Sequence, residues 1–307
     1  MDIVILLVGF SIGLVLLVKG ADEMVSSAVQ IALKFKLPSS IIGATFIGFG
    51  TSAPELFAST GAALKGDLDL GIGNIVGSNI ANSLLVVAVL YLALPKDFSQ
   101  KIKLNQISPV WMAILTTVFV STYVLTNEFP FLLGAVLLIL VIYVIYKMIS
   151  TESVDEGELL GEEKNYIWLR GGLSLLATLY GSQLVVDNAV AIAELFGVSS
   201  LIIGSTIIAI GTSLPEVAGT ISAAKMRKPD IVFGNIFGSN LFNIGLVGAT
   251  AIMISPGEIS SVIDYQLFIM YFVSFIAIFL SRNVIKRNSL LGYLFIVGYI
   301  LFLFSLF

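Results

Sequence analysis

Hydrophobic residues run along this chain in stretches of about 20, the length that crosses the hydrocarbon core of a bilayer as an α-helix. The pattern predicts about ten such spans in two sets of five. Their expected positions are 3–29, 38–64, 70–94, 106–125 and 130–149, then 166–193, 199–225, 230–254, 263–281 and 289–306. We therefore predict an all-α integral membrane protein with no separate soluble domain.

One polar stretch interrupts the apolar pattern near the middle of the chain. It carries the acidic residues Glu152, Asp155, Glu156, Glu158, Glu162 and Glu163. The predicted organisation is a first five-helix repeat at 1–150, an acidic linker at 151–165 and a second five-helix repeat at 166–307. The simplest interpretation of the linker is a solvated connector.

Composition agrees with the span pattern and restricts the chemistry. The 307 residues are 57% hydrophobic and 12% charged, and they include no Cys and no His. Disulfides, thiolate or imidazole metal ligands and histidine proton relays are thereby excluded. The first apolar stretch lacks a basic leader and a small-residue cleavage site, so we expect a retained helix.

Two short motifs occur twice, at a constant offset of 161 residues. The segment 50–55 reads Gly-Thr-Ser-Ala-Pro-Glu, and 211–216 reads Gly-Thr-Ser-Leu-Pro-Glu. Likewise, 73–79 reads Gly-Asn-Ile-Val-Gly-Ser-Asn, and 234–240 reads Gly-Asn-Ile-Phe-Gly-Ser-Asn. Roughly half of positions 41–83 match their partners without a gap, which indicates an internal duplication.

The basic residues predict how the two repeats sit in the membrane. With ten spans, every Lys and Arg except Lys65 falls on one side, which the positive-inside rule makes cytoplasmic. Both termini are then external, and the linker is cytoplasmic. Because each set has an odd number of spans, the repeats have inverted topology, an arrangement that places transporter binding sites near the membrane midplane.

The duplicated motifs bring carboxylates into apolar surroundings, where ionisable groups are costly and mark functional sites. Glu55 and Glu216 each follow a proline, and Pro54 and Pro215 predict breaks that expose backbone carbonyls to a cavity. Ca²⁺ takes six to eight oxygen ligands, and two glutamates would neutralise its charge. Na⁺ can use the same oxygens. The small-residue motifs also suit close helix packing, but packing alone would not require the repeated Glu, Thr, Ser and Asn.

At these residues the chain resembles the cation/calcium exchanger superfamily, in the branch of prokaryotic sodium/calcium exchangers with two inverted alpha-repeats. The resemblance implies antiport of Na⁺ against Ca²⁺ at four adjacent cation sites. It implies the carboxylates of Glu55 and Glu216 as shared ligands, and the backbone carbonyls of Thr51 and Thr212 as ligands of Ca²⁺. The flanking Na⁺ sites would use Gly48, Ala209, Ser52, Ser213, Ser78 and Ser239, and the central position would be bordered by Asn82 and Asn243.

Asn243 is a departure, because some members, including potassium-dependent ones, carry Asp there. The resemblance therefore favours potassium-independent exchange, with H⁺/Ca²⁺ exchange and a divalent cation channel as alternatives. We expect a cell-membrane transporter and not an enzyme. The expected ligands are Ca²⁺ and Na⁺, and the expected surroundings are the lipid bilayer. No cofactor, no nucleic acid and no obligatory protein partner are expected.

Overall fold

The computed structural model describes residues 3–101, 107–151, 166–197, 209–282 and 284–306. In the first half it contains α1 (Ile3–Phe35), α2 (Ser39–Ile42), η1 (Gly43–Ile47), α3 (Gly48–Thr51), α4 (Ala53–Leu64), α5 (Leu68–Ala81), η2 (Asn82–Val86), α6 (Val87–Ala93), α7 (Ile107–Thr126) and α8 (Phe131–Thr151). In the second half it contains α9 (Ile167–Leu195), α11 (Ala209–Gly211), α12 (Leu214–Lys225), α13 (Pro229–Phe242), η5 (Asn243–Gly248), α14 (Ala249–Ile254), η6 (Ser261–Ile263), α15 (Asp264–Ser281) and α16 (Ser289–Phe304).

The chain is an all-helical membrane protein, and most predicted spans correspond to observed helices. Among the described residues, seven helices are long and apolar enough to cross a bilayer, or eight if the bent pair Ser39–Thr51 and Ala53–Leu64 is one span. The remaining predicted spans are the shorter α16 and the segment 199–225, of which 199–208 lie outside the described residues. Ten spans and their inverted orientation stay predictions, as does the linker, most of which is also outside the described residues.

The first helix is longer than the predicted 3–29. It continues to Phe35 because residues 30–37 contain no glycine or proline, and it ends where Lys36 adopts a positive φ of 53°. Its 33 residues exceed what is needed to cross a bilayer upright, so it must lie tilted or extend beyond the hydrocarbon.

The duplication is visible in the helix boundaries. The bounds of α12 and α13 repeat those of α4 and α5 at the offset of 161 residues. In each half the helix that carries the second motif, α5 or α13, continues into a π-helical turn that starts at an asparagine, Asn82 in η2 and Asn243 in η5. The sequence did not predict these wider turns, which in other proteins frequently mark functional sites.

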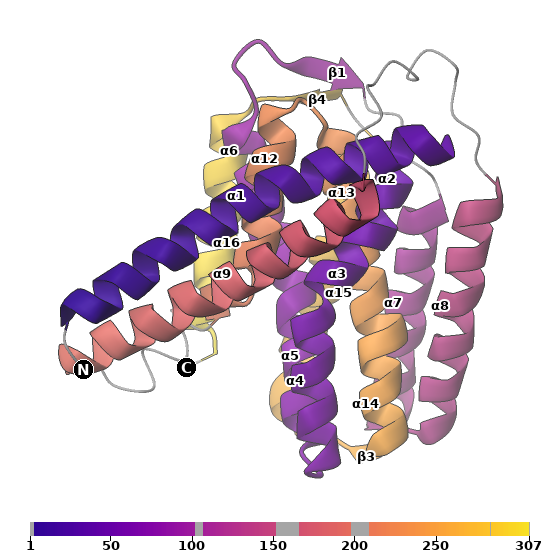
Figure 1. Ribbon diagram of the computed structural model, residues 1–307. Helices are drawn as coiled ribbons and strands as arrows, with labels where there is room; N and C mark the ends of the chain where they lie inside the picture. Colours follow the sequence, from indigo (N-terminus) through magenta and orange to yellow (C-terminus); the bar gives the residue numbers. More distant parts are fainter. Residues whose placement is uncertain (1–2, 102–106, 152–165, 198–208, 283, 307) are drawn as a thin grey trace.

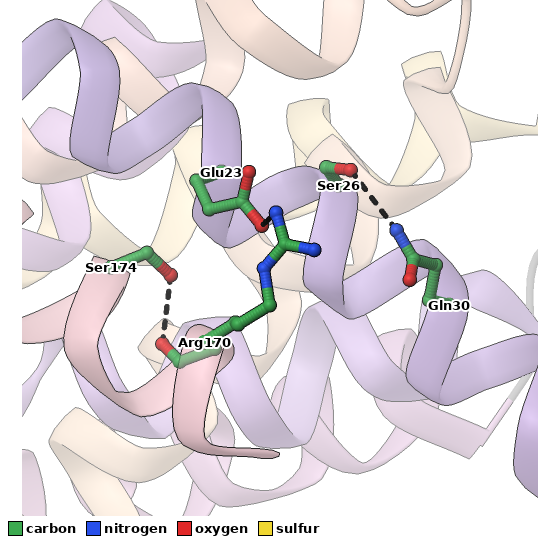
Figure 2. A network of polar contacts seen from close by, with 6 residues as sticks. Glu23, Ser26, Gln30, Arg170 and Ser174 are labelled. Atoms are coloured by element: carbon green, nitrogen blue, oxygen red, sulfur yellow. Dashed lines mark hydrogen bonds and ion pairs between the residues drawn. The ribbon is translucent and has the colours of Figure 1, made fainter. Parts of the chain in front are cut away.

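The two longest helices form a separate layer. Figure 1 shows α1 and α9 side by side and antiparallel, crossing obliquely over the upright helices. Glycines allow the close approach, because a Cβ on Gly13 would lie 2.8 Å from Leu184 Cβ. Arg170 also forms a 2.7 Å ion pair with Glu23, seen in Figure 2. Both charged side chains are more than one-third exposed, so helix packing contributes more than this pair to the contact.

Short strands join loops of the two halves. At one end β1 (Ser99–Lys101) pairs antiparallel with β4 (Val284–Lys286), and at the other β2 (Glu128–Phe129) pairs with β3 (Gly257–Glu258). Near the first pair, Arg227 donates to the Asp97 carboxylate at 2.6 Å and holds the pKa of that exposed group below its usual range. The two halves are therefore connected on both faces of the helical body.

Helix α13 is the most enclosed element, and its glycines explain how it fits. A Cβ on Gly238 would overlap the carbonyl oxygen of Ala44, and one on Gly234 would overlap that of Ser40. The backbone of α13 therefore contacts the backbone of α2 and η1 directly, as small residues permit between membrane helices. This contact holds the motif at 234–240 against the helical segment that leads into the first Gly-Thr-Ser-x-Pro-Glu motif.

We predict that Gly238→Ala lowers the free energy of unfolding by about 1–3 kcal/mol, because the added methyl group has no space. The matched control is Gly61→Ala in α4, where no described residue lies within 4 Å of the new Cβ. That variant should be neutral or slightly stabilising, since Ala is the better helix former. Thermal unfolding in detergent checks both, and equal melting temperatures would contradict the proposed contact.

Candidate cation-binding site

Each Gly-Thr-Ser-x-Pro-Glu signature forms a break between two helices. In the first half α3 ends at Thr51, and α4 begins at Ala53 after a bend of 45°. In the second, α11 ends at Gly211 and α12 begins at Leu214. Proline stands near the start of both α4 and α12, where its missing N–H removes no helical hydrogen bond. The predicted breaks are thus confirmed in the described residues.

The break places each carboxylate in the first turn of a helix. Glu55 lies in the first turn of α4 and Glu216 in that of α12, where the helix dipole favours negative charge. Both are almost inaccessible, with exposed fractions of 4% and 2%. They lie close enough to interact electrostatically with each other. The structure therefore brings the two repeated carboxylates to one buried site.

Both carboxylates retain unused acceptor capacity. Ser78 donates to Glu55 Oε1 at 3.3 Å, and the Thr51 hydroxyl is a partner of the Glu216 carboxylate. The other oxygen of each, Oε2, is buried with no hydrogen-bond partner among the described residues. A buried carboxylate oxygen without a donor is costly, and a bound cation is one way to satisfy it.

Neutral oxygens from both halves surround this pair. Ser239 donates to the Gly48 carbonyl at 3.3 Å and lies 3.5 Å from the Thr51 hydroxyl. The Ser52 hydroxyl is buried at the first break without a partner in the described part of the chain, and Ser213 is buried at the second. These side chains can supply ligands without adding charge.

The two asparagines predicted to border the centre bind to other amides. Asn82 Nδ2 donates to Asn240 Oδ1 at 3.1 Å, and Asn243 Nδ2 donates to Asn79 Oδ1 at 3.0 Å. These contacts are equivalent under the offset of 161 residues, so each half gives one donor and one acceptor. Asn240 also donates to Ser83 at 3.2 Å. Asn79 and Asn240 belong to the repeated motifs, whose amides are candidate oxygen donors, but they were not assigned to a cation site, and Ser83 was not predicted.

Two predicted residues differ in their surroundings. Thr212 is exposed, whereas its counterpart Thr51 is fully buried. Ala209 begins α11, and its side chain lies outside what the structure describes. The site is therefore closed around the first signature and open beside the second.

Two cavities reach the signatures. A cavity of about 400 Å³ is walled by the C-terminal half of α9 and touches Pro54 and Pro215. A second, of about 200 Å³, lies beside the C-terminal end of α16 and touches Asn74 and Ser78. Thr212 lines both. Among the described residues no group of three or more acidic side chains forms a metal cluster, so the site consists of two carboxylates plus neutral oxygens.

The fold and the site define a multi-pass helical membrane protein with an oxygen-lined, buried carboxylate pair. The chain belongs to the sodium/calcium exchanger protein family, whose sequence profile matches residues 5–151 and 166–307. This membership confirms the resemblance drawn from the two repeated motifs.

Individual relatives cover most of the chain. It is 39% identical to the putative antiporter CaxA of Alkalimonas amylolytica, over 81% of each chain. It is 32% identical to the sodium/calcium exchanger MaX1 of Methanosarcina acetivorans, over 96% of this chain and 97% of that protein. Among solved structures, the sodium-calcium exchanger NCX_Mj soaked without Na⁺ and Ca²⁺ superposes with a TM-score of 0.84 at 28% identity over 100% of both chains.

We predict that Asn240→Ala destabilises the fold by about 1–3 kcal/mol, because it leaves buried polar groups of Asn82 and Ser83 without their partner. The control is Asn188→Ala on α9, where, among the described residues, the amide donates only to the carbonyl of Leu184 one turn earlier. Melting temperatures in detergent should fall clearly more for the first variant. Equal losses would argue against a structural role of the paired amides.

Proposed function

We propose that this protein is a secondary active antiporter that exchanges Na⁺ for Ca²⁺ by alternating access. The observation that carries the proposal is the buried pair Glu55 and Glu216, each with an oxygen that has no hydrogen-bond partner among the described residues. Membership of the sodium/calcium exchanger family and the likeness to NCX_Mj support it. The repeated surroundings suit a coordination shell better than an enzyme active site.

The ligands match the chemistry of hard cations. Two carboxylates balance the charge of one Ca²⁺, and hydroxyl and carbonyl oxygens would complete its six to eight ligands. In this proposal Glu55, Glu216 and the carbonyls of Thr51 and Thr212 hold Ca²⁺. The residues proposed for the flanking Na⁺ sites are Gly48, Ala209, Ser52, Ser213, Ser78 and Ser239, with Asn82 and Asn243 beside the central position.

Coupling follows from the burial of the pair. Two carboxylates in a low-dielectric interior repel each other strongly unless cations or protons neutralise them. An empty, charged site is therefore unfavourable in any state that is closed to water. Only an occupied site would cross between the two faces, which makes exchange obligatory.

Asn243 bears on the choice of ions. Its amide donates to Asn79 and adds no negative charge, so the site holds two carboxylates. We propose potassium-independent exchange on this basis. A proton could replace Na⁺ at the glutamates, so H⁺/Ca²⁺ exchange is the alternative, and a divalent channel with the same acidic ring is a more distant one. The proposed orientation has external termini and a cytoplasmic linker.

We predict that Glu55→Gln and Glu216→Gln each weaken Ca²⁺ affinity by more than tenfold, since the loss of a charge-assisted interaction costs about 1.5–3 kcal/mol. Calorimetric titration of the detergent-solubilised protein with Ca²⁺ checks this. Glu128→Gln is the matched control, because Glu128 is exposed on β2, outside the site. Wild-type affinity in both site variants would indicate that the carboxylates have a structural role only.

We also predict that an outward Na⁺ gradient drives Ca²⁺ uptake into proteoliposomes, with the same rate in the presence and absence of K⁺ and with pH clamped. A rate that ignores the Na⁺ gradient but follows a pH gradient would favour H⁺/Ca²⁺ exchange. A Ca²⁺ flux that persists when trans Na⁺, Ca²⁺ and protons are all withheld would identify a channel.

A further inference from the structure

The two halves have the same helices at the signature but different hydrogen bonds. In the first half Asn74 Nδ2 donates to Ser59 Oγ at 2.9 Å, and Ser59 donates to the carbonyl of Gly71 at 3.1 Å. Asn74 also approaches the Glu55 carbonyl at 3.5 Å. These bonds join α5 to α4 directly behind the carboxylate.

The equivalent positions in the second half are Asn235 and Thr220, and they are not bonded to each other. Asn235 Oδ1 instead lies 3.3 Å from Ser239 Oγ, as an alternative to the Gly48 carbonyl for the single hydrogen of that hydroxyl. Thr220 is 1% exposed, and its hydroxyl has no partner among the described residues. A buried hydroxyl without a partner is unfavourable, because it has lost its hydrogen bonds to water and gained none in the protein.

The serines differ in the same sense. Ser78 donates to Glu55, whereas its counterpart Ser239 donates to the Gly48 carbonyl of the other half. In addition, α4 lies along α5 more closely than α12 lies along α13, although both pairs have identical lengths. Three observations thus place the first half in a closed arrangement and the second in an open one.

We propose that the hydrogen bonds Asn74–Ser59 and Asn235–Thr220 form alternately, as two latches. In the present conformation the first is formed and the second is broken, which leaves the Thr220 hydroxyl without the amide that would donate to it. In the conformation that opens to the opposite side, Asn235 donates to Thr220, Ser239 turns toward Glu216, and Asn74 leaves Ser59. Thr220 and Ser59 are therefore positioning residues, which set the balance between the two conformations without touching the ion.

This inference rests on the proposed function only in requiring two opposite conformations. Inverted repeats that exchange their local conformations produce such a pair, because each half then adopts the shape that the other had. The buried, unpaired hydroxyl is then a cost of one conformation that the other removes. A hydroxyl that was merely tolerated would have the same energy in both.

The test uses two single cysteines in a chain that has none. Ser182→Cys reports the present conformation, because Ser182 is 6% exposed and lines the 400 Å³ cavity. Ala21→Cys reports the opposite one, because Ala21 is its counterpart in the repeat and is fully buried here. The rate at which each reacts with a membrane-impermeant maleimide in detergent measures how often its side is open.

Thr220→Val should slow the labelling of Ala21→Cys about fivefold, the effect expected for the loss of one hydrogen bond in the opposite conformation. Ser59→Ala should accelerate it by a similar factor, because it weakens the present conformation. Thr220→Ser, which keeps the hydroxyl, should leave the rate unchanged.

An unchanged rate in Thr220→Val, or a change in the same direction in Thr220→Val and Ser59→Ala, would overturn the proposal. Partial unfolding is distinguished by faster labelling of both reporters together with a lower melting temperature. Ser59→Ala removes a single hydroxyl, and its predicted acceleration of labelling is a second, independent test of the proposal. Labelling requires no ion gradient, so failed Na⁺/Ca²⁺ exchange in proteoliposomes and failed latching are separate results.

Discussion

The repulsion between two buried carboxylates is the constraint on which the rest of this structure depends. Glu55 and Glu216 are tolerated because both lie in the first turn of a helix, because a hydroxyl approaches each of them, Ser78 of the same half at Glu55 and Thr51 of the other half at Glu216, and because two cavities reach the signatures. The broken helices follow from the same requirement. In a continuous helix the backbone N–H and C=O groups would all be hydrogen-bonded within the helix, and no helix N-terminus would lie at this depth.

The enclosed helix α13 shows how packing serves this site. Its glycines remove the side-chain layer that normally separates two helices, so that its backbone meets α2 and η1 directly. That proximity allows Ser239 of one half to reach the Gly48 carbonyl of the other. The small residues, which alone would indicate only packing, are thus what makes a site from two halves possible.

Much of this arrangement could be predicted from the sequence, and particular residues explain what could not. Repetition at a fixed offset identified Glu55 and Glu216, and the prolines identified the breaks, because those are chemical requirements of single positions. The π-helical turns at Asn82 and Asn243 were not predicted, since they depend on how neighbouring helices pack. The different exposure of Thr51 and Thr212 could not be predicted either, because both threonines occupy the same position in motifs that differ only at Ala53 and Leu214.

The amide contacts between the two halves also have an evolutionary consequence. Asn79 pairs with Asn243 and Asn82 with Asn240, so each contact joins the last asparagine of one repeated motif to the asparagine three residues beyond the other motif. Two copies of a single half-length chain, related by a two-fold axis, would form both contacts from one pair of asparagines, as self-complementary dimer interfaces do. An interface between two such identical chains would contain both bonds, and the joining of the halves in one chain leaves each half free to change separately.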